Sequence, residues 1–307
     1  MTHNTNIYDL IIIGAGPAGI TAGVYAARKR MNLLVISKDI GGQAAWSGDI
    51  ENYTGYQFIT GPDLAAKFEE HMRKYSIALK ENEEALDISK KDNAIVVKTD
   101  KGEYESKALI IASGKVSKEL GVPGEREFKN RGLTYCATCD APLFTGKDVA
   151  VIGGGNSALD ATLQLMKIAR RVYLFNITSS LGGDVIMRDK IEKSGIVDIY
   201  NDTQVTAIVG DRMVKGINVK RKDKEESLAV QGVFVEIGLV PNSGFAKGIG
   251  RNEKGEIKIN CHNETNIPGI FASGDVTDVP EKQIVIAAGE GSKAALSAFK
   301  YINRNRN

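Results

Sequence analysis

Cysteine is scarce in this sequence, with three residues in a chain of 307. Long apolar runs are missing as well, because no stretch approaches the roughly 20 residues that cross a bilayer. The segment before Tyr8 is short and polar and lacks the apolar core of a signal peptide. Few cysteines and no export signal favour a cytoplasmic protein that does not contact a membrane.

Charge of one sign is not in excess, since the formal net charge is +2. No strong field for nucleic acid is implied, so we expect no nucleic-acid partner. The apolar fraction of 42% and the charged fraction of 25% are ordinary for a globular protein. The length is enough for two domains, each with a packed core.

Two of the three cysteines, Cys136 and Cys139, stand two residues apart in the stretch CATCD. Such a pair closes a small ring and can switch between dithiol and disulfide with little backbone movement. Structural zinc needs four ligands, and the remaining Cys261 and the scattered histidines supply no second pair, so we expect no metal. An inert disulfide over so short a loop would stabilise little. The pair is therefore interpreted as a redox centre, and Cys261 as a free structural thiol.

A strand, a glycine loop and a helix open the chain. The run YDLIII predicts a buried strand over 8–13, GAGPAG follows at Gly14, and a helix is predicted over 20–30. Gly14 allows a tight turn and Gly16 lets the backbone approach a pyrophosphate at the helix N-terminus. A second strand, NLLVI, follows, which makes this a dinucleotide-binding unit.

A second unit of the same kind begins at Asp148, with a strand over 148–152, the loop GGGNSA at Gly153 and a helix to about Ala169. Two such units predict either two bound dinucleotides or one unit retained for its fold alone. The next strand ends at Phe175, and the sequence NITSSLGG follows it. Neither an arginine for a 2′-phosphate nor a carboxylate for a free 2′-hydroxyl stands there. The nucleotide preference therefore stays open.

The other elements suggest a split α/β fold. We expect a packing helix over 61–75, an antiparallel excursion over 88–99 and 102–108, a buried strand over 109–114, and short strands over 205–219 and 228–238. A strand ending in Gly274-Asp275 and a last helix from Lys282 to Tyr301 follow. Linkers are expected at Val122-Pro123-Gly124 and at 238–242. The prediction is two Rossmann-like three-layer domains, the second inserted into the first, with boundaries 1–117 plus 243–307 and 118–242.

These motifs together resemble the low-molecular-weight thioredoxin reductase family of flavoproteins, close to the flavoprotein part of the alkyl hydroperoxide reductase flavin subunit. The resemblance runs from Tyr8 to about Ile302. The additional N-terminal thioredoxin-like domains of that subunit are expected to be absent. The motifs that carry the resemblance are GAGPAG at Gly14, GGQ at Gly41, IENYTG at Ile50, CATCD at Cys136, GGGNSA at Gly153, GLVPN at Gly238, FASGD at Phe271 and KQIVIAAGEG at Lys282.

The resemblance implies an FAD domain, an inserted pyridine-nucleotide domain and a two-fold homodimer. Asp275 would hold the ribitol, while Asn52 and Gln283 would lie at the edge of the isoalloxazine. The residues implied for FAD are Gly14, Gly16, Pro17, Ala18, Ser37, Lys38, Gly42, Gln43, Asn52, Ser113, Gly114, Gly274, Asp275, Lys282, Gln283 and Ile284. Those implied for the nucleotide are Gly153, Gly155, Asn156, Ser157 and Ala158.

The implied reaction is that of a thioredoxin-disulfide reductase. Electrons pass from NAD(P)H through FAD to Cys139, which would face the flavin, and Cys136 would attack the disulfide of thioredoxin. Asp140 would act as the acid, although a charge favourable to a helix N-terminus explains it as well. Because the family's arginine motif for NADPH is missing, NADH, reduced ferredoxin or a deazaflavin are alternative donors. A flavin dithiol oxidase that uses oxygen, and a flavin-bound redox sensor without turnover, are further alternatives.

Overall fold

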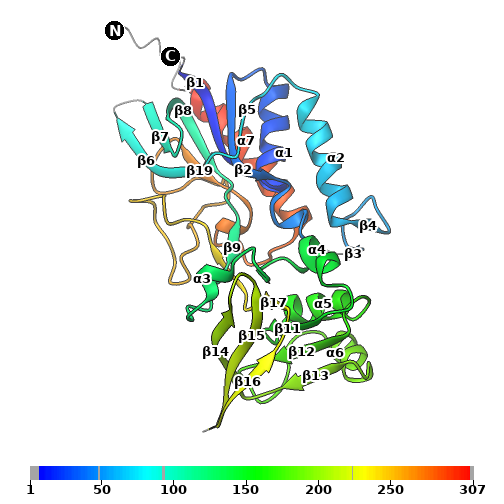
Figure 1. Ribbon diagram of the computed structural model, residues 1–307. Coiled ribbons are helices and arrows are strands. Elements are labelled where there is room, and N and C mark those ends of the chain that lie inside the picture. Colours follow the sequence, from blue (N-terminus) through cyan, green and yellow to red (C-terminus); the bar gives the residue numbers. More distant parts are fainter. Residues whose placement is uncertain (1–6, 48, 92–93, 223, 305–307) are drawn as a thin grey trace. The chain divides into compact units, whose positions relative to one another are not determined.

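The computed structural model describes residues 7–47, 49–91, 94–222 and 224–304 (Figure 1). The chain forms two compact units, which we call the first unit (Met1–Val116 with Val240–Asn307) and the second unit (Ser117–Leu239). It passes between them at two short strands that pair with each other, β9 (Lys115–Ser117) and β18 (Leu239–Pro241). Residues 1–6, which include His3, lie outside the described residues. The prediction that this segment is not a signal peptide falls on them.

The first unit is built on a seven-stranded sheet with β1 near its centre. β1 pairs in parallel with β2 on one side and with β8 on the other. β8 uses its first residues for antiparallel pairing with β7 and its last three residues for parallel pairing with β19. The strands are β1 (Tyr8–Ala15), β2 (Leu33–Ile40), β5 (Ala78–Glu81), β6 (Ala85–Lys91), β7 (Ala94–Thr99), β8 (Glu103–Ile111) and β19 (Ile270–Ala272).

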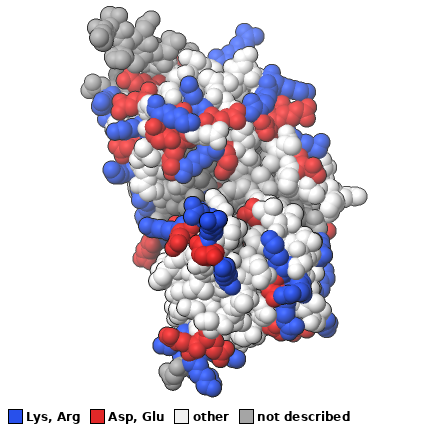
Figure 2. Space-filling view, in the orientation of Figure 1, with Lys and Arg blue, Asp and Glu red and all other residues white. Residues whose placement is uncertain are grey.

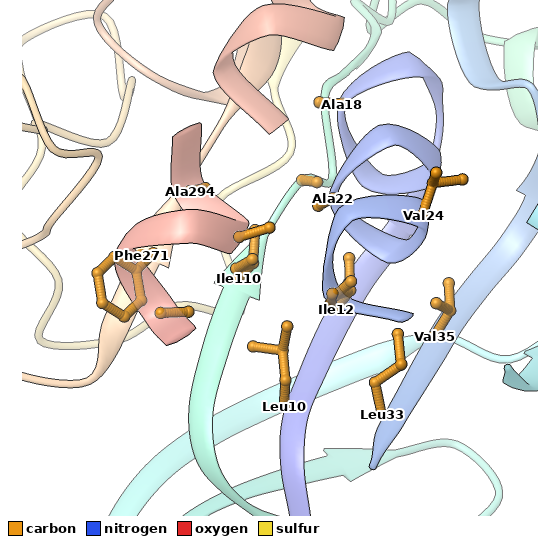
Figure 3. Packing of buried hydrophobic residues seen from close by; sticks show 14 of the residues in the cluster. Leu10, Ile12, Ala18, Ala22, Val24, Leu33, Val35, Ile110, Phe271 and Ala294 are labelled. Carbon is orange, nitrogen blue, oxygen red and sulfur yellow. The ribbon is translucent and has the colours of Figure 1, made fainter. Parts of the chain in front are cut away.

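Alternation along β1 separates two cores. Leu10 and Ile12 point into the face covered by helices α1 (Pro17–Arg28) and α7 (Ile284–Arg304), as Figure 3 shows. Ile11 and Ile13 point into the opposite face, where they join buried residues of β6, β7 and the segment 245–259. Helix α2 (Gly61–Arg73) packs beside α1 (Figure 1). The first unit therefore has three layers, as predicted.

The second unit repeats this plan around a five-stranded parallel sheet of order β10-β17-β11-β12-β13. Val149 and Val151 of β11 face one side with helix α5, while Ala150 and Ile152 face an antiparallel three-stranded sheet on the other. The elements are α3 (Glu125–Phe128), β10 (Leu133–Thr134), α4 (Ala137–Asp140), β11 (Asp148–Ile152), α5 (Asn156–Leu165), β12 (Arg171–Phe175), α6 (Val185–Glu192), β13 (Val197–Tyr200), β14 (Thr203–Gly210), β15 (Val214–Arg221), β16 (Lys224–Ala229) and β17 (Gly232–Val235).

Three expectations from the sequence need correction. The stretch 88–99 belongs to two strands, β6 and β7, which pair antiparallel, and the polar run SKKDN separates their apolar residues. The strands expected over 102–108 and 109–114 are one strand, β8, because its apolar end carries straight on from its polar beginning. The presumed linker at Val122-Pro123-Gly124 packs inside the second unit, where the Ile208 N–H donates to Pro123 O at 2.9 Å.

Basic and acidic side chains are mixed over the visible face of the molecule (Figure 2). That mixture agrees with the net charge of +2 and with the absence of a field of one sign. Within the described ranges, no helix is both long and apolar enough to cross a membrane.

Candidate active site

Cys136 and Cys139 form a disulfide at the start of helix α4, with 5.4 Å between their Cα atoms. Cys136 is the N-cap residue of this one-turn helix, and its Sγ accepts the Cys139 N–H at 3.1 Å. Cys139 is exposed and Cys136 partly buried. Asp140 ends the helix, and its own N–H donates to Cys136 O at 3.2 Å. The helix start predicted for the CATCD stretch is thus present.

Two acidic residues that sequence reasoning missed lie next to this helix. Glu236 directly follows β17, and its carboxylate accepts the N–H of Ala137. Burial, followed by the negative charge of Asp160 on α5, raises the pKa of Glu236 to about 8, while the Ala137 N–H lowers it. An acid directly after the apolar run VFV was the one available signal in the sequence.

Tyr135, just before the disulfide, is held by a buried carboxylate. Its hydroxyl donates to Glu125 Oε1 at 2.7 Å. Glu125 also accepts the N–H groups of Leu120 and Gly121, each at 2.6 Å. Burial, followed by Glu125, raises the pKa of Tyr135, so the phenol stays protonated at neutral pH. This network anchors the chain just ahead of Cys136.

In the first unit, two glycine loops meet at the carboxyl ends of the parallel strands. Gly14 has φ +104°, and a Cβ there would overlap Ala112 O, so only glycine fits. The Gly41 N–H donates to Ala15 O at 2.7 Å, and a Cβ on Gly42 would lie 3.2 Å from Gly16 Cα. Bare backbone from two loops therefore lines the N-terminus of α1, the geometry that a pyrophosphate requires.

Other residues predicted for FAD gather at the same strand ends. Asn52 Nδ2 donates to Gln283 Oε1 at 3.0 Å, and Gln43 Nε2 donates to Lys115 O at 3.2 Å. Asp275 lies on the 3₁₀ turn η3 (Gly274–Val276) that follows β19. Gly274 packs so closely on α1 that a Cβ there would lie 2.9 Å from Ala18 Cβ.

Asp275 is suited to hold a polar ligand. Among the described residues, no hydrogen bond reaches its partly buried carboxylate. Burial raises its pKa, and the nearby Lys282 and Lys115 act in the opposite direction. A carboxylate with free acceptor oxygens beside bare loop backbone fits the hydroxyls and pyrophosphate of a flavin nucleotide.

Some of the predicted FAD residues have structural partners within the chain. The Ser37 hydroxyl is buried and accepts the Ala15 N–H at 3.0 Å, so it supports the glycine loop. Lys38 forms an ion pair with Glu84, and the Ser113 hydroxyl donates to Asn242 O at 2.7 Å. Pro17 is the first residue of α1, Gly114 has positive φ, and Ile284 begins α7.

A charged cluster stands next to Asp275. Lys115 Nζ and Lys282 Nζ lie 3.3 and 3.2 Å from Glu256 Oε1. Burial alone would raise the pKa of Glu256, but hydrogen bonds from Asn252 and the two lysines hold it at about 2. Glu256 therefore fixes the position of Lys282, one of the predicted FAD residues.

The second glycine loop follows β11. A Cβ on Gly153, at φ +142°, would overlap Glu236 O, whereas one on Gly155 would meet nothing within 4 Å. Gly155 is the N-cap of α5 and makes no side-chain cap. Asn156 Oδ1 accepts the Asp184 N–H at 2.8 Å, so this amide is partly used by the chain. Of the other predicted residues, Ser157 is exposed and Ala158 is buried.

Asn176 directly follows β12, and only 4% of its surface is exposed. Its Nδ2 donates to Thr178 O, Ser180 O and Asn201 Oδ1 at 3.1, 2.8 and 3.1 Å. Its Oδ1 accepts the Thr178 N–H and hydroxyl. The amide is therefore saturated by its own loop and has no capacity left for a ribose.

The second unit has a disulfide and a glycine loop at Gly153, and the first unit has a glycine loop at Gly14 and the carboxylate of Asp275. Together these features define a class of protein. The family model for pyridine nucleotide-disulphide oxidoreductases matches residues 8–291, and the chain belongs to this family. Membership implies binding of a flavin and a nicotinamide nucleotide. The part of the chain that the structure describes holds no group of three or more metal-ligating side chains.

Curated relatives share the sequence over most of this chain. A Staphylococcus aureus protein, named as a subunit of alkyl hydroperoxide reductase, is 42% identical over 307 residues, 99% of this chain and 61% of the relative. A Ferdinandcohnia aciditolerans protein named NADH dehydrogenase is 40% identical over 301 residues, 97% of this chain and 58% of the relative. The chain thus spans about 60% of the length of these relatives.

Solved structures with the same fold confirm the predicted resemblance and fold class. Thioredoxin reductase from Lactococcus lactis is 34% identical with a TM-score of 0.88, covering 97% of this chain and 99% of that one. The enzyme from T. acidophilum is 35% identical with a TM-score of 0.86, covering 98% and 99%. A ferredoxin-flavin thioredoxin reductase from Clostridium acetobutylicum is 31% identical with a TM-score of 0.54, covering 97% and 98%.

Proposed function

We propose that the protein is an FAD-dependent thioredoxin-disulfide reductase. The Cys136–Cys139 disulfide at the start of α4 is the observation that carries this proposal, because a disulfide that is reduced to two thiols can pass its electrons to the disulfide of a partner. Similarity to solved thioredoxin reductases over nearly the whole chain supports it. The partner in this proposal is thioredoxin or a thioredoxin-like protein, and the enzyme acts as a cytoplasmic homodimer.

FAD would be held by the first unit. When bound, the flavin supplies two-electron chemistry, accepting a hydride and passing electrons to a disulfide. The backbone of Gly14 and Gly16, with the start of α1, would bind the pyrophosphate. Asp275 would accept hydrogen bonds from the ribitol, and the Asn52–Gln283 pair would orient the ring.

Reduction breaks the S–S bond between Cys136 and Cys139, and each sulfur gains one electron. The thiolate of Cys136 then attacks the disulfide of the partner, because only a thiolate is an effective nucleophile. Asp140, one residue after Cys139, holds or delivers a proton at the sulfur. One sulfur of the partner leaves as a thiolate and takes a proton from solvent, while the other is bound to Cys136 in a mixed disulfide. The sulfur of Cys139 then attacks Cys136, which re-forms the Cys136–Cys139 disulfide and releases the second sulfur of the partner.

For the electron donor we propose two alternatives. NADPH is the family's usual donor, but the saturated Asn176 has no capacity to distinguish a 2′-phosphate from a 2′-hydroxyl. The first alternative is a nicotinamide nucleotide, with NADH and NADPH used within about tenfold of each other. The second is a donor without a nucleotide, such as reduced ferredoxin or a deazaflavin, and the name of the Clostridium relative favours it.

The experiment follows flavin absorbance and insulin-coupled thioredoxin reduction under anaerobic conditions. NADPH, NADH and reduced ferredoxin are supplied in separate assays to the wild type, Cys136→Ser, Cys139→Ser and Cys261→Ser. We expect either both nucleotides or reduced ferredoxin to bleach the flavin in all four proteins, and thioredoxin reduction only in the wild type and Cys261→Ser. Thioredoxin reduction that persists in Cys136→Ser or Cys139→Ser would reject the proposal. Fast oxygen uptake with a small dithiol, without thioredoxin reduction, would favour the oxidase.

A further inference from the structure

A carboxyl group that the proposed reaction does not use lies beside the redox disulfide. Glu236 is fixed at the end of β17, where its N–H donates to Ile152 O at 2.7 Å. Its carboxylate accepts the N–H of Ala137, the residue that follows Cys136. Glu236 therefore contacts the first residue inside the disulfide ring.

A second carboxyl group is connected to the other residue in that ring. The Thr138 hydroxyl donates to Gln164 Oε1 at 3.1 Å, and Gln164 Nε2 donates to Asp160 Oδ2 at 2.7 Å. Asp160 and Gln164 lie one turn apart on α5, so the helix holds this connection in place. The negative charge of Asp160 also raises the pKa of Glu236. Each residue between the cysteines is thus tied to one member of an acidic pair.

The elements packed against Glu236 bring few other ionisable groups. β11 ends beside it in Ile152, β10 ends in Thr134, and neither residue carries a charge. From α5 it is faced by Asp160, and α4 brings the two sulfurs and, at its far end, Asp140. Because burial and Asp160 raise the pKa of Glu236 to about 8, this carboxyl is largely neutral at pH 7.

We propose that Glu236 and Asp160 form an acidic pair that positions the residues between Cys136 and Cys139, and that Glu236 takes up one proton when the disulfide is reduced. In that step two electrons, from a dithiol or from reduced flavin, break the S–S bond. One sulfur becomes a thiol with a proton from solvent, and the other remains a thiolate. The new negative charge favours the protonated form of Glu236, which takes its proton from solvent as well.

The sign of the pH dependence follows from this charge balance. Below the point where Glu236 ionises, this carboxyl is already protonated and has no effect on the pH dependence of reduction. Above that point, reduction requires one more proton, so the reduced state loses up to about tenfold in equilibrium constant per pH unit. For a two-electron couple, a tenfold change in the equilibrium constant shifts the reduction potential of the disulfide by about 30 mV, here per pH unit.

The test measures the equilibrium between the Cys136–Cys139 disulfide and dithiothreitol in the purified flavoprotein. Reduced protein is counted by its mass after thiol alkylation, from about pH 6 to about pH 9.5, in the wild type and in Glu236→Gln. We divide the equilibrium constant for reduction of the wild type by that of Glu236→Gln. We expect this ratio to be constant below about pH 7 and to fall above about pH 8. A ratio that is the same at every pH would show that Glu236 supports the fold alone, and it would overturn the proposal.

Two further variants complete the test. Asp160→Asn removes the facing charge, so the break in the profile should move to lower pH; a break that does not move would reject the pair. Asp198 on β13 pairs with Arg171 on β12, and Asp198→Asn should keep the wild-type profile. The inference rests on the proposed function only for the redox role of the disulfide. A disulfide that exchanges with dithiothreitol but never reduces thioredoxin would reject that function and leave this equilibrium measurable.

Discussion

Asn52 and Gln283, which are 231 positions apart in the sequence, are joined by a hydrogen bond of 3.0 Å between Asn52 Nδ2 and Gln283 Oε1. The bond ties the loop after β3 (Asp49–Ile50), ahead of β4 (Ile59–Thr60), to the residue before α7. It thereby connects the two sequence segments of the first unit at the position where we place the flavin ring.

Asn52→Ala should weaken flavin retention by about tenfold, because one hydrogen bond and its orientation of Gln283 are lost. The measurement is the ratio of flavin to protein absorbance after dialysis at graded dilution. Asn218→Ala, which removes the acceptor of the Ser227 hydroxyl in the second unit, is the matched control. Equal flavin content in both variants would contradict the placement of the ring.

Gly153→Ala and Gly155→Ala should separate folding from ligand binding. The first places a methyl group against Glu236 O at a positive φ, and we expect a loss of about 2 kcal/mol or more in unfolding free energy. The second has open space and ordinary φ, so its urea midpoint should match the wild type. If a nucleotide binds at α5, Gly155→Ala should still raise the KM for that nucleotide. A stable Gly153→Ala protein would contradict the described loop.

Glu256→Gln should destabilise the first unit in a pH-dependent way. The pKa of Glu256 is depressed from 4.5 to about 2, so its contribution is present above about pH 4.5 and is lost as the pH falls toward 2. We expect a difference of about 3 kcal/mol at neutral pH that shrinks below pH 4.5. Urea unfolding at several pH values measures it, with the exposed Glu253→Gln as control. A pH-independent difference would show that the charge is not involved.

Asn176→Asp should destabilise the second unit without creating a ribose site. The carboxylate would lose the donor group and face the carbonyl oxygens of Thr178 and Ser180. We expect a loss of about 2 kcal/mol in the urea unfolding of this unit and no fall in the KM for NADH. Asn218→Asp, on an antiparallel strand of the same unit, serves as control. An improved KM for NADH would show that the loop opens to the nucleotide.

The sequence predicted those features that contiguous residues determine. The glycine loops at Gly14 and Gly153 and the helix start at Cys136 depend on local backbone geometry, which a short motif specifies. The saturation of Asn176 and the approach of Glu236 to Ala137 depend on side chains brought together by the sheet, and no spacing in the sequence encodes them. The antiparallel pairing of β6 with β7 was missed, because the stretch 88–99 was taken as one strand although the polar run SKKDN interrupts its apolar residues.

The split of the first unit has a consequence during synthesis on the ribosome. β19 completes the edge of β8, and α7 packs so closely on α1 that a Cβ on Gly291 would overlap Ala18 O. Until these last elements emerge, the apolar face of α1 stays uncovered, whereas the contiguous second unit can already fold. We therefore expect the nascent chain to acquire its protease-resistant second unit first, and to depend on chaperones most while residues 240–307 are still being added.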